Sequence, residues 1–161
     1  LAIDGEIVAG AVFDPVRDEL FSAEKGSGAH VNGRRLQVTT ASRLIESLLI
    51  TGFPYDLHEK LDERLRPFNR VMGKARAVRR DGSAALDLCY VAAGRADGFW
   101  EVILKPWDMH AGRLVVEEAG GRATRLDGTP LGLGPDGCVA TNGHIHDALV
   151  EALREETPAL G

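Results

Sequence analysis

From residue 47 onward, short apolar runs alternate with segments of helical periodicity, and this alternation constrains the fold more than any other feature. Residues 47–51, 75–78, 97–104 and 139–141 are apolar runs that predict strands. Residues 57–72, 83–93, 106–119 and 146–154 predict helices, because apolar side chains recur there at three- and four-residue spacing. Strands that alternate with helices are typical of α/β proteins, so we predict that class.

The first 35 residues have a different pattern. Residues 6–13 and 19–23 predict two strands joined by a turn at 14–18, and Gly26, Gly28 and Asn32-Gly33 predict further tight turns. We therefore predict a layered sandwich, with a mixed, largely parallel sheet flanked by helices and preceded by a short antiparallel meander. Residues 1–161 form one unit without a linker, and the tail after Glu156 is predicted to be frayed.

Composition and charge limit the class of function. Hydrophobic residues make up 44% and charged residues 27% of the 161 residues, as in ordinary globular proteins. The net charge of -5 argues against a general nucleic-acid binder, and no apolar run is long enough to span a membrane. The cluster Arg76, Arg79 and Arg80 is interpreted as solvated strand-end charge, with an anion site as the alternative. Cys89 and Cys138 are predicted to be buried hydrophobes in a reducing compartment, so the predicted location is cytoplasmic.

The chain opens at Leu1-Ala2-Ile3, already apolar and without an initiating methionine. A chain that starts inside a strand-like pattern is expected to be part of a longer protein.

The helix predicted over residues 106–119 carries the strongest functional signal. Its start reads PWDMHAG and its end reads VVEEAGG. A carboxylate in the first turn, here Asp108, commonly caps free N–H groups and complements the helix dipole. The alternative role for Asp108 is a hard oxygen ligand for Mg²⁺. Local physics alone favours the cap.

A second segment reads DGSAALDL at 81–88 and leads into VAAGRADGFWE at 91–101. The small residues Gly82, Ser83 and Ala84 at a helix start expose N–H donors and a hydroxyl to a polar ligand. The carboxylate of Glu101 is suited to accept hydrogen bonds from vicinal hydroxyls. Plain capping and an ordinary exposed strand residue are the respective alternatives.

Both segments resemble the inositol monophosphatase family, which belongs to the magnesium-dependent, lithium-sensitive sugar and inositol phosphatases. Residues 106–121 are similar to its second signature, Trp-Asp followed by Ala-Gly and then Glu-Ala-Gly-Gly. Residues 81–101 are similar to its substrate-binding wall. The runs GAVFDP at 10–15, GSGA at 26–29, TGFPY at 51–55 and ATNG at 140–143 extend the resemblance over nearly the whole chain.

The resemblance implies the C-terminal part of the sugar-phosphatase fold, with Asp108 as a ligand of a catalytic Mg²⁺. It further implies that Gly82, Ser83, Ala84 and Glu101, together with Asp108, contact the substrate. The implied reaction is hydrolysis of a phosphate monoester of inositol or a related polyol by metal-activated water, inhibited by lithium. The implied partner is this small molecule, and no nucleic acid or membrane. Homodimers are common in the family.

Three features depart from the family pattern. His110 stands where the family usually has a small residue, but residues i and i+2 do not share a helix face, so it is expected to point away from Asp108. The family's glutamate beside a Gly-Asp turn and its Asp-Pro-x-Asp-Gly-Thr loop do not occur in the chain. The runs DPVRD at 14–18 and LDGT at 126–129 only imitate that loop and are predicted to be turns. No catalytic set is therefore complete, and the 161-residue chain alone is predicted to be inactive.

Other functions stay open. One alternative is a binding or assembly module that has kept the fold and lost the metal loop. Others are relatives that act on fructose 1,6-bisphosphate, histidinol phosphate, NADP or adenosine 3',5'-bisphosphate. The pattern of Gly82 to Ala84 with Glu101 favours a polyol monophosphate.

Overall fold

A computed structural model describes residues 1–54 and 56–154. The prediction of a frayed tail after Glu156 lies outside these residues. In the described part of the chain, no helix is both long and apolar enough to cross a membrane.

A five-stranded sheet forms the centre of the molecule. Its strands are β7 (Leu48–Thr51), β8 (Ala77–Arg79), β9 (Gly98–Leu104), β10 (Arg122–Thr124) and β11 (Asp136–Thr141), in the order β10-β11-β9-β7-β8. Strand β7 runs parallel to β8 and β9, whereas β11 runs antiparallel to β9 and β10. The sheet is therefore mixed, as predicted. Its central strands are buried on both faces, because helices cover each side.

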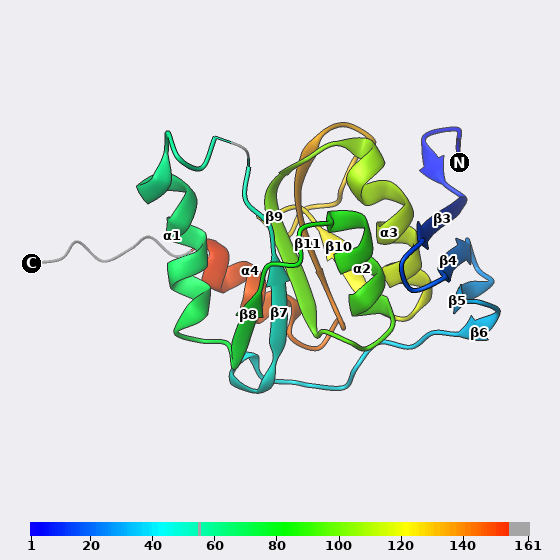
Figure 1. Ribbon diagram of the computed structural model, residues 1–161, viewed down its shortest axis with the longest axis horizontal. Coiled ribbons are helices and arrows are strands. Elements are labelled where there is room, and N and C mark those ends of the chain that lie inside the picture. The colour runs from blue at the N-terminus through cyan, green and yellow to red at the C-terminus, as the bar shows by residue number, and fades with distance from the viewer. Residues whose placement is uncertain (55, 155–161) are drawn as a thin grey trace, which may run out of the picture.

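Helices lie in one layer on each face of this sheet (Figure 1). Helices α1 (Leu61–Met72) and α4 (His146–Arg154) contact each other on one face, and α2 (Ala84–Ala92) and α3 (Pro106–Glu118) contact each other on the opposite face. The bounds of α4 agree with the sequence prediction. Helix α1 begins at Leu61 and not at residue 57, because residues 56–59 form turns that follow Pro54.

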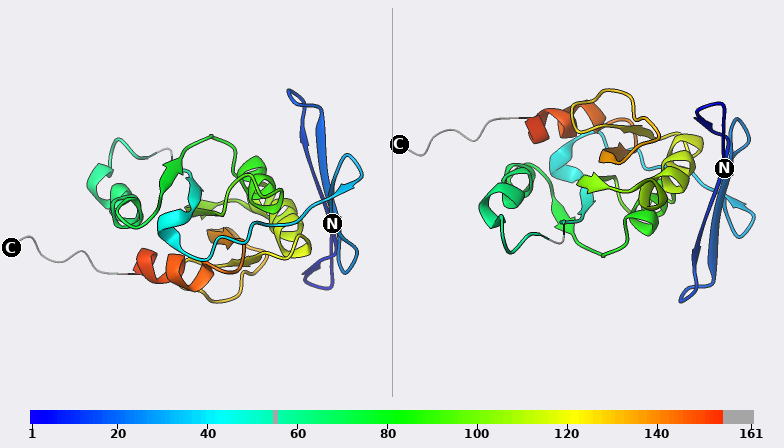
Figure 2. Two further views of the ribbon diagram at one scale, coloured as in Figure 1. Left: turned by 90° about the horizontal axis from the view of Figure 1, so that it is seen from below. Right: turned by 90° about the horizontal axis from the view of Figure 1, so that it is seen from above.

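The antiparallel meander forms a further layer beyond α2 and α3 (Figure 2). Its strands β3 (Ala9–Asp14), β4 (Glu19–Glu24), β5 (Gly28–Val31) and β6 (Arg34–Arg35) pair in sequence order. The strand predicted over residues 6–13 is interrupted at Val8, because β2 (Glu6–Ile7) pairs instead with β1 (Ala2–Ile3) in a separate ribbon. The layered sandwich and the meander confirm the predicted fold class.

The meander packs closely on α3. A methyl group on Gly10 would lie 2.9 Å from the Cα atom of Ala111, so only glycine permits this approach. At the end of α3, the Glu118 carboxylate accepts hydrogen bonds from the backbone N–H groups of Gly26 (2.7 Å) and Gly28 (2.8 Å). The glutamate of the EEAGG run therefore holds the loop between β4 and β5.

Two hydrophobic clusters fill the spaces between these layers. One contains Phe21, Phe99 and Val115 and lies among the sheet, α2, α3 and the meander, while the other contains Trp100 and Leu149 on the opposite face of the sheet. Cys89 and Cys138 are buried and unbridged, which confirms that part of the prediction for both.

A buried polar network fastens the connection between the meander and the sheet. The Asp97 carboxylate accepts hydrogen bonds from the Thr39 hydroxyl (2.5 Å) and the Leu48 N–H (2.7 Å). The Asn142 side chain donates to the Thr39 hydroxyl (2.9 Å) and to the Ala41 carbonyl (2.8 Å). Residues 39–41 are thus held against the sheet.

His146 lies fully buried at the start of α4, between Thr124 and Thr141. The Thr124 hydroxyl donates to the Arg125 carbonyl (2.8 Å) and therefore accepts from Nε2–H of His146 (2.9 Å). Nδ1 is then left to accept from the Thr141 hydroxyl (3.0 Å). Both ring nitrogens of the neutral imidazole are bonded.

Candidate active site

A cavity of about 270 Å³, lined by both apolar and charged side chains, opens at the carboxyl ends of the parallel strands β7, β8 and β9. Ligand sites of open α/β sheets form in this position, where the loops that leave the strands diverge. The five residues predicted to bind metal or substrate all line it, although they come from three separate segments: Gly82, Ser83, Ala84, Glu101 and Asp108.

The start of α2 forms one wall of the cavity. Gly82 has φ = +95°, a conformation that glycine adopts without strain, and it turns the chain from β8 into the helix. Ser83 occupies the N-cap position, but its side chain makes no capping hydrogen bond. Its hydroxyl and the first N–H groups of the helix are therefore available to a ligand.

Asp108 combines the two roles considered from the sequence. Its Oδ2 accepts a hydrogen bond from the backbone N–H of Lys105 at 3.3 Å, which is the capping interaction. The side chain is only half-buried and also lines the cavity. Capping fixes its position at the helix start and leaves the carboxylate turned toward the same space as Glu101.

Glu101 projects from β9 into the cavity beside Gly52. A methyl group on Gly52 would lie 2.5 Å from Cδ of Glu101, so the glycine makes room for the carboxyl. Burial and, to a smaller extent, the negative charge of Asp108 raise the pKa of Glu101 to about 7, although the positive charge of Arg80 opposes both. The two carboxylates thus repel each other across the cavity, which favours a cation or hydrogen-bond donors between them.

Carboxylate oxygens are the ligands that Mg²⁺ prefers, so the chemistry of Asp108 fits this ion. One such ligand does not make a magnesium site. Within residues 1–54 and 56–154, no group of three or more His, Cys, Asp or Glu side chains is placed to hold a metal ion. The described chain therefore offers part of a coordination shell.

Three further charged residues line the cavity that the sequence analysis did not select as site residues: Arg80, Asp87 and Lys105. The Arg80 guanidinium lies over the Phe53 ring, 5.3 Å from its centroid, at the rim of the cavity. Asp87 lies deeper, one turn into α2. Its spacing of four residues from Ser83, which places both on one helix face, was the signal available in the sequence. Arg80 is exposed directly after β8, as its interpretation as solvated strand-end charge requires, but it also lines the cavity.

His110 lies elsewhere, as its position on the helix predicted. It lines a separate hollow beside the meander together with Pro106 and Ala111, and it does not line the cavity that contains Asp108. Burial, together with the positive charge of Arg113, lowers the pKa of His110.

The two runs that imitate the family's metal loop are turns. Asp14 accepts hydrogen bonds from the N–H groups of Val16 (3.0 Å) and Arg17 (3.2 Å) between β3 and β4. Asp127 accepts from the N–H (2.9 Å) and the hydroxyl (2.6 Å) of Thr129. Neither carboxylate lines the cavity.

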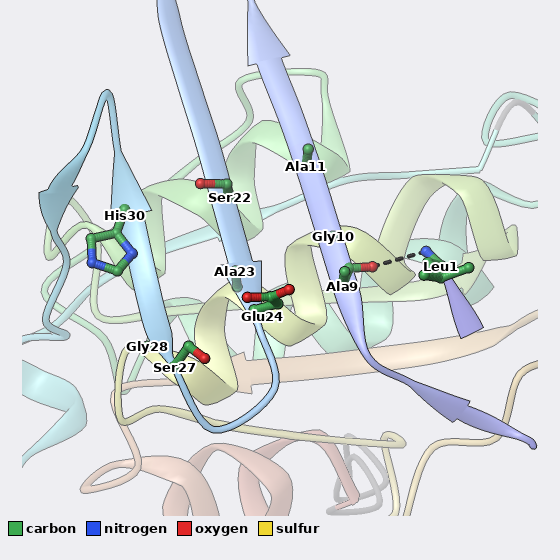
Figure 3. A pocket seen from close by; sticks show the side chains of 10 residues that line it. All are labelled: Leu1, Ala9, Gly10, Ala11, Ser22, Ala23, Glu24, Ser27, Gly28 and His30. Carbon is green, nitrogen blue, oxygen red and sulfur yellow. Dashed lines mark hydrogen bonds between the residues drawn. The ribbon is translucent and has the colours of Figure 1, made fainter. Parts of the chain in front are cut away.

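A larger hollow, of about 530 Å³, lies on the outer face of the meander (Figure 3). Small side chains such as Ala9, Ala11 and Ser22 form most of its floor, and the N-terminal amino group of Leu1 donates to the Ala9 carbonyl at its edge (2.8 Å). None of the predicted site residues lines it. Size alone therefore does not identify the candidate site.

Comparison with known proteins gives matches over most of the chain. The family model described as the inositol monophosphatase family matches residues 1–158. An inositol-1-monophosphatase of Synechocystis sp. is 47% identical and is aligned over 89% of this chain and 50% of that protein. An inositol-1-monophosphatase of Rhizobium meliloti is 44% identical, over 96% of this chain and 58% of that protein. Nus factor SuhB of Escherichia coli (strain K12) is 41% identical, with 96% and 58% covered.

Solved structures agree with the sequence matches. The inositol monophosphatase from Anabaena (Nostoc) sp. superposes with a TM-score of 0.89 at 46% identity, covering 94% of this chain and 60% of that one. The extragenic suppressor protein suhB from Bartonella henselae gives 0.85 at 44% identity, with 95% and 59% covered. The chain thus spans between 50% and 60% of the length of the relatives it matches.

Proposed function

Because the chain belongs to the inositol monophosphatase family, we propose that a protein of full family length containing it, here called the full-length form, is a magnesium-dependent phosphatase. It hydrolyses a phosphate monoester of inositol or a related polyol. The observation that carries this proposal is the meeting of Gly82, Ser83, Ala84, Glu101 and Asp108 in one cavity.

Each residue has a role that its chemistry supports. Asp108 would hold Mg²⁺ through a carboxylate oxygen, in a position that the Lys105 N–H fixes. When bound, this ion would neutralise phosphate charge and lower the pKa of a water molecule that attacks phosphorus. Glu101 would accept hydrogen bonds from substrate hydroxyls, and the uncommitted hydroxyl of Ser83 would donate one. The polyol is thereby oriented with its phosphate toward Asp108.

The 161-residue chain alone is proposed to lack this activity. Asp108 is a single ligand, and the described residues offer no group of three metal-ligating side chains. Catalysis would require further carboxylates from the part of the full-length form that lies outside this chain. Lithium inhibition, homodimerisation and a cytoplasmic location belong to the same proposal.

The test compares the full-length form with the 161-residue chain in hydrolysis of inositol 1-phosphate with Mg²⁺. We expect turnover by the full-length form only, and a loss of about 100-fold or more in kcat/KM for its Asp108→Asn variant. Folding of the variant is checked by circular dichroism and thermal unfolding. Turnover by the short chain, or a fully active Asp108→Asn variant, contradicts the proposal.

A second candidate function has one specific observation in its favour. A relative that is 41% identical over 96% of this chain is named Nus factor SuhB and not as a phosphatase. The chain could on this basis serve as a binding or assembly module. A folded full-length form that hydrolyses none of a panel of sugar, inositol and nucleotide phosphates supports the module, whereas turnover of any one of them supports the enzyme.

A further inference from the structure

Asp87 is a buried carboxyl group to which the proposed function gives no role. It lies four residues after Ser83 in α2, and residues four apart share one helix face. Its side chain is 1% exposed, and it lines the cavity together with Ser83 and Glu101. Asp87 therefore faces the space that the proposed substrate would occupy.

The hydrogen bonds of this carboxyl are incomplete. Among the described residues, no group bonds to Oδ1 of Asp87, although this atom is buried. A buried acceptor without a partner destabilises the fold by about 1–3 kcal/mol, and more when it is charged. Native proteins rarely keep such a group without a reason. The other oxygen, Oδ2, is not sealed in this way, and Asp87 lines the cavity, so a donor on a ligand there would reach the carboxyl through Oδ2.

The charges around Asp87 indicate what kind of ligand fits. Burial, together with the negative charges of Asp81 and Glu101, raises the pKa of Asp87 to about 7. Arg80 and Lys105 also line this cavity and attract a phosphate group, but the wall formed by Asp87 and Glu101 repels a second one. It suits an uncharged group that donates hydrogen bonds, such as a hydroxyl.

We propose that Asp87 is a further substrate-binding residue, which accepts a hydrogen bond from a hydroxyl group of a neutral polyol monophosphate held between α2 and β9. This inference rests on the proposed function and narrows its substrate class. Glu101 and Asp87 would contact two hydroxyls of one polyol from different walls of the cavity. Bisphosphates are disfavoured, because their second phosphate would meet the acidic wall.

A purely structural role would have different consequences. Asp87 also borders a neighbouring cavity of about 510 Å³ that Arg79 and Arg95 line. A carboxyl that only balanced these arginines would affect every substrate alike when removed. Substrates with and without hydroxyl groups therefore separate the two roles.

The experiment measures kcat/KM of the full-length form with inositol 1-phosphate and with p-nitrophenyl phosphate, which has no hydroxyl groups. For Asp87→Ala we expect a decrease of about 10-fold or more with inositol 1-phosphate, carried mainly by KM, and about twofold with p-nitrophenyl phosphate. Asp87→Asn, whose amide oxygen still accepts, is expected to recover most of this loss and to raise the relative rate with fructose 1,6-bisphosphate.

Asp97→Asn is the matched control, because Asp97 is also buried but accepts two hydrogen bonds from the chain outside the cavity. Its effect is expected to be equal for both esters. Equal losses with both esters for Asp87→Ala, or no loss, overturn the inference.

If the full-length form hydrolyses neither ester, the proposed function fails and Asp87 is judged by binding alone. Titration calorimetry with inositol 1-phosphate then decides. A tenfold weaker affinity of Asp87→Ala supports the inference, and an unchanged or unmeasurable affinity in both forms contradicts it.

Discussion

Two groups of buried polar side chains in this fold differ in how their hydrogen bonds are met. Asp97, Asn142 and His146 bond to partners within the chain, and together they fasten the meander connection and α4 to the sheet. Asp87 and Glu101 line the cavity and have raised pKa values, and Oδ1 of Asp87 has no partner among the described residues. The first group stabilises the fold, whereas we propose that the second group binds a ligand.

The comparison predicts that removing a satisfied carboxyl has the largest effect on stability. Asp97→Ala would leave the buried Leu48 N–H and the Thr39 hydroxyl without their acceptor. We expect a decrease of about 4 kcal/mol in the free energy of unfolding, measured by urea denaturation at pH 7. Asp97→Asn keeps one acceptor and is expected to lose less. A change below about 1 kcal/mol for Asp97→Ala would remove the distinction between the groups.

Removing the carboxyl of Asp87 is predicted to raise the free energy of unfolding, whereas removing that of Asp97 lowers it. The pKa of Asp87 is about 7 in the folded state, above its ordinary value of 3.8, so its stabilising contribution is present at low pH and is lost as the pH rises through 7. Asp87→Asn abolishes this loss. We expect it to raise the free energy of unfolding by about 3 kcal/mol at pH 8 and by clearly less at pH 5. A destabilised variant at pH 8 would place Asp87 in the structural group.

His146, which belongs to the group with complete hydrogen bonds, gives a further test of the comparison. Burial, together with the positive charge of Arg122, lowers its pKa from 6.5 to about 4. The unfolded chain therefore binds a proton more readily, and stability that is present above pH 6.5 is lost as the pH falls toward 4. As the pH falls from 7.5 to 5.0, we expect His146 to lower the free energy of unfolding by about 2 kcal/mol. In His146→Gln, the decrease in the free energy of unfolding over this pH range is expected to be smaller by that amount. Urea midpoints that change equally with pH in both proteins would contradict this prediction.

Much of the fold could be predicted from apolar periodicity. The bounds of α4 were predicted as observed, and α2, α3 and β9 differ from prediction by a residue or two, because capping residues and glycines mark their ends. Strand β10 was missed, since Arg122–Thr124 is short and mostly polar and exists through its pairing with β11. The break at Val8 was missed for a similar reason, because only pairing separates β2 from β3.

Some residues of the candidate site could likewise be predicted from the sequence, and others could not. Asp108, Glu101 and Ser83 could be predicted, because each belongs to a segment with a family signature. Arg80 and Asp87 belong to the site because β8, α2 and β9 come together at one cavity. This arrangement is visible only in the folded structure. The four-residue spacing could have indicated that Asp87 lies on the same face as Ser83. It could not have indicated that Asp87 is buried or that its Oδ1 has no partner among the described residues.

Helix α3 joins two distant parts of the molecule. Its first turn holds Asp108, its last residue Glu118 clamps the β4–β5 loop, and its middle contacts Gly10 without space for a methyl group. Thirteen residues of helix form a rod of about 20 Å. The β4–β5 loop therefore cannot move away from the sheet without either breaking the two hydrogen bonds to Glu118 or carrying α3, and Asp108 with it.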